Sequence, residues 1–246
     1  MTARRTDDQP RPVTLVTGAS GGICGALAML LAQAGHRLVL AGLDHPGLDA
    51  VAAEATACGA EVATIAGDMR DRDHALACTD LAVERFGRLD NLVTRAGASR
   101  PVPMVEMEDD EWDKFVDLNL SAVFRVSKAA ARQMIEQGEG GAIVHISSIA
   151  HANGGANLAY GSAKGGVATL TYGMGQQLGR HGIRVNAVAP GIIDTPMVRN
   201  GFAAQFDALV EGAALRTPLG RLGKPEDVAA VIAFCSRPVR PSSPVR

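Results

Sequence analysis

The sequence predicts a doubly wound α/β fold of the Rossmann type, in which one domain is built on a parallel sheet. Short apolar runs alternate along the chain with segments whose apolar residues recur at helical spacing, and this alternation places helices on both faces of a parallel sheet. A glycine-rich turn joins the first apolar run to the first helix. The chain has 246 residues, 47% of them hydrophobic, which is enough to bury one large core.

The first strand, residues 13–16, is an apolar run that ends in Thr-Gly, and the helix after it, residues 22–34, has alanine and leucine at helical spacing. Further strands are expected at 37–41, 61–66, 91–94, 142–146 and 184–189, the last stopped by Pro190-Gly191. Further helices are expected at 48–58, 74–86, 109–134, 160–178 and 225–235. The 109–134 helix has acidic residues near its positive N-terminal end.

Composition and charge exclude several classes of protein. The formal net charge is −2, whereas a nucleic-acid binder usually carries a basic excess. No apolar run approaches the roughly 18 residues that a membrane helix needs. Arg4-Arg5 is followed by polar residues rather than an apolar stretch, which argues against export. The four cysteines lack metal-ligand spacing, so we expect reduced thiols in a cytoplasmic protein and no metal site.

Residues 17–25 read Thr-Gly-Ala-Ser-Gly-Gly-Ile-Cys-Gly and fall between the first strand and the first helix. Glycines let the backbone turn sharply and approach a pyrophosphate closely, while the helix N-terminus offers free N–H groups and a partial positive charge. The position favours a dinucleotide phosphate site over a plain strand–helix turn.

A second pattern is Tyr160-Gly-Ser-Ala-Lys164, which places the two outer residues on one face of a helix. An ammonium beside a phenol favours phenolate, so Lys164 is expected to lower the pKa of Tyr160. Such a tyrosine can exchange a proton with a carbonyl or alcohol oxygen. An amphipathic surface pair would have the same spacing.

Two further polar groups accompany this pair. Ser148 ends the fifth strand, where ligands of doubly wound sheets bind, and its hydroxyl can bond the reacting oxygen. Asn119 is an amide in an otherwise apolar stretch of the long helix and needs buried partners. It could hold a water chain to Lys164 or satisfy a break in the helix.

Together these residues resemble the short-chain dehydrogenase/reductase family, in its single-domain branch, similar to the 3-oxoacyl-acyl-carrier-protein reductases. The resemblance runs from Val13 to about Phe234. It implies an NAD(P)-dependent oxidoreductase that transfers a hydride between the nicotinamide and a small carbonyl or alcohol. It also implies that Tyr160 is the general acid and base, that Lys164 binds the nicotinamide ribose, that Ser148 orients the substrate and that Asn119 supports proton relay.

The resemblance also implies a set of cofactor-binding residues. Asp68 resembles the adenine-pocket acid, and the segment 190–195 resembles the loop that holds the nicotinamide carboxamide. The expected cofactor-binding residues are Gly18, Ser20, Gly21, Gly22, Ile23, Asp44, Asp68, Met69, Ala96, Gly97, Tyr160, Lys164, Pro190, Gly191, Ile193 and Thr195.

The chain departs from the family pattern at several positions. Cys24 stands at the third motif glycine, where it is expected to narrow the gap between the first helix and the pyrophosphate. The family's Asn-Asn-Ala-Gly is here Thr94-Arg95-Ala-Gly, in which threonine could replace one sheet-bracing amide and the arginine has no equivalent. The spacing from serine to Tyr160 is one residue short, which leaves Ser147 as an alternative. These departures motivate a second hypothesis, a weak or inactive dinucleotide-binding relative that serves as an interaction subunit.

The predicted domain limits are a flexible tail at 1–12, the dinucleotide-binding catalytic domain at 13–235 and a disordered tail at 236–246. Pro238, Pro241 and Pro244 exclude a strand in the last segment, so the family's closing strand is expected to be missing. The sixth strand would then be an exposed edge. We therefore expect a homo-oligomer in which a dimer on the long helices is favoured over a tetramer.

Shorter segments of the sequence indicate which cofactor is preferred and what kind of substrate is bound. Gly42 takes the usual acid position after the second strand, but Asp44 is close, and no arginine stands at Gly21 or Leu43. This favours NAD, with NADP possible. Residues 150–158 and 197–215 should line the pocket and its lid, and their small or apolar character indicates a modest neutral substrate.

Overall fold

The structure is a computed structural model that describes residues 11–95, 97–201, 203 and 206–237. Its sheet has six parallel strands in the order β3-β2-β1-β4-β5-β6. The strands are β1 (Val13–Thr17), β2 (Arg37–Gly42), β3 (Val62–Ala66), β4 (Asn91–Thr94), β5 (Gly141–Ile146) and β6 (Ile183–Val188). The strand order reverses beside β1, so the predicted doubly wound Rossmann-like fold is confirmed.

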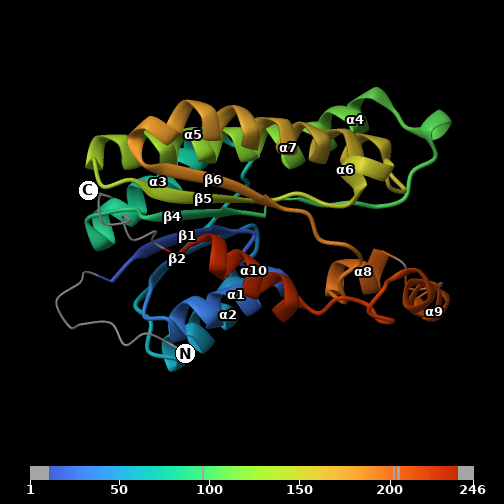
Figure 1. The fold of residues 1–246 in the computed structure, drawn as a ribbon, viewed down its shortest axis with the longest axis horizontal. Coiled ribbons are helices and arrows are strands. Elements are labelled where there is room, and N and C mark those ends of the chain that lie inside the picture. Colours follow the sequence, from blue (N-terminus) through green and yellow to red (C-terminus); the bar gives the residue numbers. More distant parts are fainter. Residues whose placement is uncertain (1–10, 96, 202, 204–205, 238–246) are drawn as a thin grey trace, which may run out of the picture.

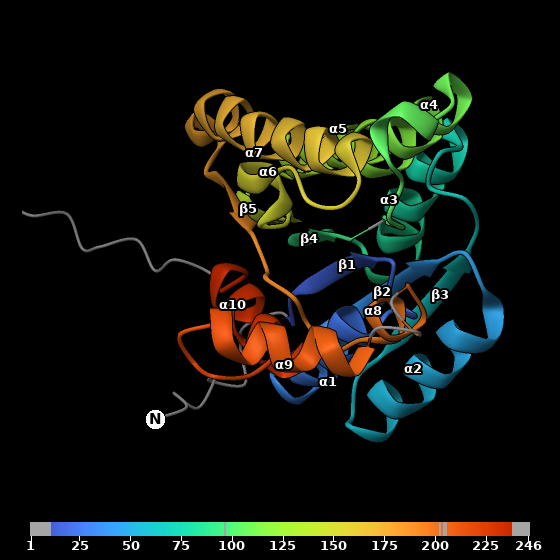
Figure 2. The ribbon, with the colours of Figure 1, turned by 90° about the vertical axis from the view of Figure 1, so that its right-hand side faces the viewer.

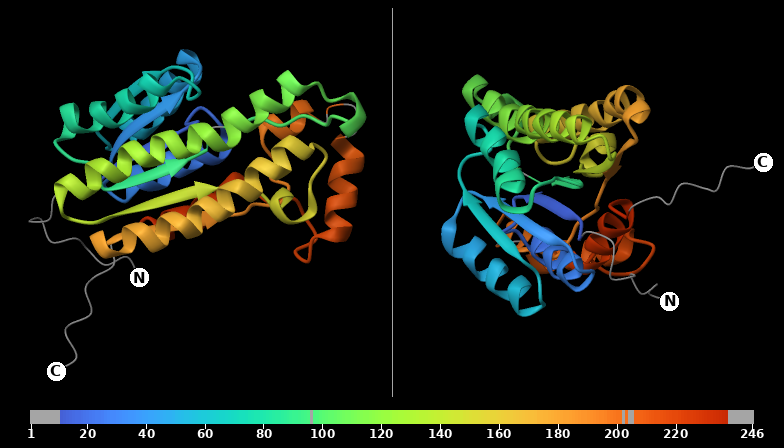
Figure 3. Two further views of the ribbon diagram at one scale, coloured as in Figure 1. Left: turned by 90° about the horizontal axis from the view of Figure 1, so that it is seen from above. Right: turned by 90° about the vertical axis from the view of Figure 1, so that its left-hand side faces the viewer.

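Helices cover both faces of the sheet (Figure 1; Figure 3). One layer holds α1 (Gly22–Gln33), α2 (His45–Ala57) and α10 (Pro225–Cys235), and the other holds α3 (Arg72–Phe86), α5 (Ala122–Gln137) and α7 (Leu158–Leu178). Each layer packs on the sheet through its own hydrophobic cluster, with β1 fully buried between the two. A parallel sheet buried on both faces needs strands that are apolar throughout, and the short apolar runs of the sequence satisfy that need.

The shorter elements gather beyond the carboxyl ends of the strands, at the end of the molecule that faces the viewer in Figure 2. They are η1 (Met104–Glu106), α4 (Asp109–Val116), η2 (Asp117–Ser121), α6 (Ala150–Asn153), α8 (Pro196–Gly201) and α9 (Phe206–Arg216). One further turn, η3 (Gly179–His181), precedes β6. In an open α/β sheet this end holds the ligand.

The prediction of one continuous helix at 109–134 is wrong. Instead α4 leads into η2, a π-helical segment of five residues, and α5 continues to Gln137, where Gly138 ends it at φ +73°. Single π turns inside α-helices are often found at functional sites. Here the π turn contains Asn119.

The C-terminal boundary also differs from the prediction. Ser236 is buried and donates to the carbonyl of Ile232, while Arg184 of β6 donates to the carbonyls of Cys235 and Arg237 at 2.8 and 2.6 Å. These bonds satisfy carbonyls at the end of α10, so residues 236 and 237 stay against the domain. The rest of the predicted tail, with the question of a closing strand, lies outside the described residues, as does the N-terminal tail up to residue 10. Within the described part, β6 is the last strand of the sheet.

Candidate active site

A small pocket opens at the carboxyl ends of the strands, between the glycine loop and the N-terminal half of α7. Its volume is about 100 Å³. It is lined by Ile23, Arg95, Gly97, Ile146, Ser147, Ser148, Tyr160, Lys164, Pro190, Gly191, Ile193, Thr195, Met197 and Val198. The structure therefore brings together predicted residues from α1, β5, α7 and the loop after β6, which are far apart in the sequence.

The glycine loop turns between β1 and α1. Gly18 has φ +63°, which side-chain-bearing residues rarely adopt, and the N–H of Ala19 reaches the carbonyl of Ala41 at 3.0 Å. The first turn of α1 has no acidic residue and no side-chain cap. A Cβ at Gly22 would lie 3.3 Å from Cγ2 of Thr195, so the loop has little room for a side chain where it faces the loop after β6. Free N–H groups and bare glycines suit a bound phosphate.

Cys24 does not lie where the sequence indicated. Its side chain is fully buried in the hydrophobic cluster under α1 and is absent from the pocket lining. Burial raises the pKa of its thiol to about 11. The expectation that Cys24 narrows the phosphate gap is therefore not supported by its position, because α1 turns this side chain toward the sheet.

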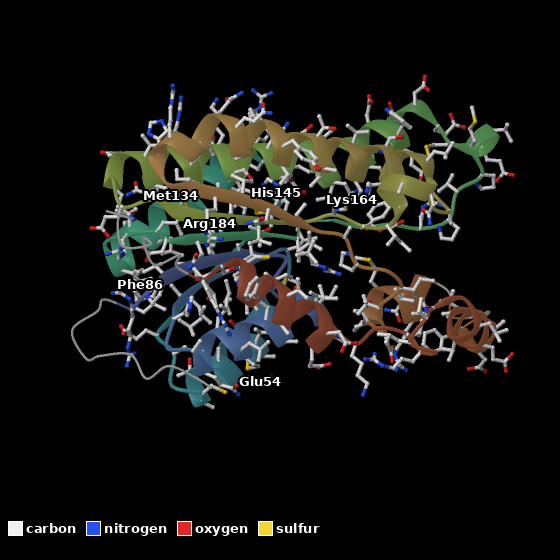
Figure 4. The ribbon with its side chains drawn as sticks, viewed as in Figure 1. Glu54, Phe86, Met134, His145, Lys164 and Arg184 are labelled. Atoms are coloured by element: carbon white, nitrogen blue, oxygen red, sulfur yellow. The ribbon has the colours of Figure 1, made fainter. Side chains whose placement is uncertain are left out.

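Tyr160 and Lys164 lie one turn apart on α7, as predicted. The helix begins at Leu158, two residues earlier than expected, because the side chain of Asn157 accepts a hydrogen bond from the Tyr160 N–H at 2.8 Å and caps it. Lys164, which is labelled in Figure 4, is buried. Its Nζ donates to the carbonyl of Ile146 at 3.0 Å and lies 5.6 Å from the centre of the Tyr160 ring.

The pKa shifts of Tyr160 and Lys164 differ from the sequence-based expectation. Burial raises the pKa of Tyr160, opposed by a hydrogen bond with Ser148 and by the positive charge of Arg95. Burial, together with the positive charge of Arg95, lowers the pKa of Lys164 to about 7. The expectation that Lys164 lowers the tyrosine pKa is therefore wrong for this structure, because desolvation dominates and the opposing charge comes from Arg95.

The two serines after β5 have different surroundings. The Ser147 hydroxyl is buried and donates to the carbonyl of Lys164 at 3.0 Å. Ser148 is half-buried, accepts from the Ala150 N–H at 3.2 Å and is within hydrogen-bonding reach of Tyr160. Only Ser148 therefore presents its hydroxyl beside the tyrosine.

Asn119 is fully buried in the π turn. Its Nδ2 donates to the carbonyls of Phe115 and Ala98 at 2.9 and 3.2 Å, so it does satisfy the helix break. Its Oδ1 has no hydrogen-bond partner among the described residues. A Cβ at Gly97 would lie 2.6 Å from this oxygen and 3.6 Å from Nζ of Lys164. The Oδ1 of Asn119 and the Nζ of Lys164 thus both lie close to Gly97, which has no side chain.

The residues expected around the adenine and carboxamide ends follow β2, β3 and β6, and two of them carry other bonds. Asp44 caps α2 by accepting from the Gly47 N–H at 3.0 Å, and the carboxylate of Asp68 is held by Arg70, which keeps its pKa low. Met69, Ile193 and Thr195 are buried, whereas Ser20 is exposed. Pro190 accepts from the Ile149 N–H at 3.0 Å. Ala96 lies outside the described residues.

Comparisons with known proteins point to one family. The sequence model of the short chain dehydrogenases matches residues 12–205. The 3-oxoacyl-acyl-carrier-protein reductase FabG of Thermotoga maritima is 37% identical over 223 residues, 90% of this chain and 89% of that protein. The cis-4-hydroxycyclohexanecarboxylate dehydrogenase of Sinomonas cyclohexanicum is 42% identical over 224 residues, 90% and 88% of the two chains. The crystal structure of NAD+-bound xylitol dehydrogenase superposes with a TM-score of 0.87 at 28% identity and covers 94% of each chain.

The chain belongs to the short-chain dehydrogenase family. Its relatives are reductases and dehydrogenases, so this short-chain dehydrogenase is an NAD(P)-dependent oxidoreductase that transfers a hydride between a nicotinamide cofactor and a carbonyl or alcohol. The comparisons do not support the second hypothesis of an inactive interaction subunit. No helix in the described part of this short-chain dehydrogenase is long and apolar enough to cross a membrane.

Three features of this short-chain dehydrogenase were missed or misjudged from sequence. Asn157 was not identified as the residue that caps α7, although asparagine before a helix is a recognised signal. Thr94 does not brace the sheet as expected, because its hydroxyl is buried with no partner among the described residues. Arg95 after it enters the pocket, a placement that no local pattern indicates.

Proposed function

We propose that this short-chain dehydrogenase interconverts a small neutral ketone and alcohol, with Tyr160 as general acid and base. The observation that carries the proposal is the meeting of Tyr160, Ser148 and Lys164 in one pocket beside the glycine loop. The nicotinamide cofactor supplies or accepts the hydride. In reduction the Tyr160 hydroxyl donates a proton to the carbonyl oxygen, and in oxidation it accepts the alcohol proton.

The neighbours of Tyr160 have distinct parts in this proposal. Ser148 donates a hydrogen bond to the substrate oxygen and holds it beside the tyrosine. Lys164 binds the nicotinamide ribose, where polar partners would return some of the solvation that burial removes and favour its charged form. Asn119 accepts a hydrogen bond at its free Oδ1, which allows a water to link it to Lys164 above Gly97.

The residues at the rest of the site fit a dinucleotide. The N–H groups of residues 22 and 23 at the start of α1 would hold the pyrophosphate. The Oδ1 of Asn119, which has no partner among the described residues, could accept a hydrogen bond from a ligand or water beside Gly97. The loop 190–195 would hold the carboxamide through the Ile193 backbone and the Thr195 hydroxyl.

We infer a preference for NAD over NADP. A Cβ atom added to Gly47 would lie within 3 Å of both an Asp44 carboxylate oxygen and the Ser20 side chain. The Asp44 carboxylate therefore lies beside the glycine loop. Its negative charge would accept a bond from a ribose hydroxyl and repel a 2′-phosphate. Arg70, which follows β3, is already paired with Asp68.

We also propose that copies of the chain associate as a dimer. A groove of about 940 Å³ crosses α3, η2, α5 and α7, and large apolar side chains such as Leu76 and Phe124 are about half exposed there. Basic and acidic residues alternate around them, among them Arg125, Lys128, Asp80 and Glu136. Such a mixed surface can be self-complementary across a two-fold axis.

A panel assay tests the proposed reaction. The purified chain is mixed with NADH or NADPH and with cyclic ketones, open-chain ketones and a 3-oxoacyl thioester, and nicotinamide absorbance is followed. Oxidation of NADH by neutral ketones, faster than oxidation of NADPH, is the expected result. Turnover confined to the thioester, or faster with NADPH, would contradict the substrate or the cofactor preference respectively.

A further inference from the structure

Arg95 is a charged residue of the pocket that the proposed reaction does not use. It follows β4 directly, and its N–H donates to the hydroxyl of Thr17 at 3.1 Å, which fixes its backbone at the end of β1. Its side chain crosses to the glycine loop, where a Cβ built on Gly21 would lie only 3.0 Å from the guanidinium carbon. The guanidinium therefore lies against the first turn of α1.

The charges around this guanidinium are unbalanced. None of the ion pairs in the described part of the chain includes Arg95. The first turn of α1 contributes a partial positive charge and no acidic residue. Lys164 lines the same pocket. The guanidinium, the α1 N-terminus and the protonated form of Lys164 thus share a partly buried space in which the described residues supply no anion. An entering anion would stabilise this arrangement.

The size of the pocket shows what must happen to Arg95 when a ligand enters. The pocket has about 100 Å³, whereas sites for ligands of drug size or larger occupy roughly 300 to 1,000 Å³. The arginine side chain is long and flexible, and it contacts Gly21 rather than a fixed partner. A rotation about its side-chain bonds would open the space while keeping the guanidinium near the start of α1.

We propose that Arg95 binds the pyrophosphate of the dinucleotide together with the N-terminal turn of α1. The inference rests on the proposed function, because it assumes that a dinucleotide occupies this site. A guanidinium matches two phosphate oxygens with parallel N–H donors, and this geometry makes arginine effective in phosphate recognition. The residue that the family places here is a neutral asparagine, so this chain would hold its cofactor with one additional charge.

The opposite possibility is that Arg95 obstructs the site. An arginine that fills the phosphate position without bonding the cofactor would have to be displaced, and its removal would then strengthen binding. The two possibilities predict changes of opposite sign in one measurement.

The test is the affinity of Arg95→Asn for three ligands, measured by calorimetry without turnover. The ligands are NADH, ADP-ribose, which keeps the pyrophosphate but lacks nicotinamide, and adenosine, which lacks phosphate. We expect about tenfold weaker binding of NADH and ADP-ribose, as for loss of a charged hydrogen bond, with adenosine unchanged. Added salt should weaken NADH binding less in the variant than in the wild type.

Arg85→Asn is the matched control. Arg85 is an exposed residue in the last turn of α3, at the amino edge of the sheet, and its replacement removes the same charge far from the pocket. It should leave all three affinities unchanged. Equal or tighter binding of ADP-ribose to Arg95→Asn would overturn the inference alone, whereas a wild-type protein that binds neither NADH nor ADP-ribose would overturn the proposed function as well.

Discussion

The side chain of Asn157 links Tyr160 to Arg100: its Oδ1 accepts a hydrogen bond from the Tyr160 N–H at 2.8 Å, and its Nδ2 donates to the carbonyl of Arg100 at 2.9 Å. One amide thus caps α7 and ties the start of that helix to the loop after β4. Since Tyr160 is in the first turn of α7, this amide sets where the phenol enters the pocket.

We expect Asn157→Ala to lower the free energy of unfolding by about 1 kcal/mol, because it removes an N-cap. Turnover should fall as well, since the first turn of α7 frays. Asn157→Asp keeps the capping oxygen and should retain most of the stability. Urea denaturation of both variants measures the effect, and equal stability of Asn157→Ala and wild type would show that water replaces the cap.

Tyr160→Phe should reduce turnover by roughly a hundredfold or more, because it removes the general acid and base, while NADH affinity largely survives. The matched control is Tyr172→Phe on the same helix, whose side chain is 78% exposed and should be irrelevant to the rate. Steady-state kinetics on the two variants decide the assignment. A Tyr160→Phe rate above about a tenth of wild type contradicts the proposed role.

His145 should make the fold less stable in acid. It is buried between the hydroxyls of Ser127 and Thr171, and burial, with the charge of Lys164, lowers its pKa to about 4 from 6.5. Between these values the unfolded chain takes up a proton that the folded chain does not, so stability falls as pH drops from 6.5 to 4.

The loss from this one group is at most roughly 3 kcal/mol at 1.36 kcal/mol per pKa unit. His145→Asn cannot titrate and should show a flatter dependence of unfolding free energy on pH in this window. Parallel pH profiles for wild type and variant would place the acid sensitivity on other groups.

Cys24→Gly should destabilise the protein by about 1 to 3 kcal/mol, because it opens a cavity in the core and puts a glycine inside α1. NADH affinity should not rise, since the thiol does not line the pocket. Cys58→Ser, at an exposed thiol, serves as the control. Tighter NADH binding by Cys24→Gly would restore the sequence-based expectation that the thiol crowds the pyrophosphate.

Phe124→Asp should convert a dimer into a monomer, because it places a charge in the apolar part of the groove over α5. Light scattering of wild type and variant measures the change in mass. Phe234→Asp alters a comparably exposed aromatic residue on α10, in the opposite layer, and should leave the dimer intact. A wild-type tetramer, or a Phe124→Asp dimer, would mean that copies meet elsewhere.

The sequence by itself predicted the layers of the fold and several of the residues that line the pocket. Apolar strands alternating with helices have essentially one way to bury both faces of a sheet, so the doubly wound fold follows from local patterns and chain handedness. The pair Tyr160 and Lys164 was predictable for the same reason, since helical spacing alone puts both on one face. The glycine turn was recognisable because its backbone conformation requires glycine.

Only the tertiary structure decided how these groups are charged and bonded. Burial, rather than the neighbouring lysine, sets the direction of the Tyr160 pKa, and no local pattern reports burial. The hydroxyl of Ser147 is bonded to a carbonyl on another element, whereas that of Ser148 lies beside Tyr160. Arg95 reaches Gly21, which is far from it in the sequence, because β1 and β4 are adjacent in the sheet. Contacts between distant segments depend on strand order and packing, and those are properties of the folded chain as a whole.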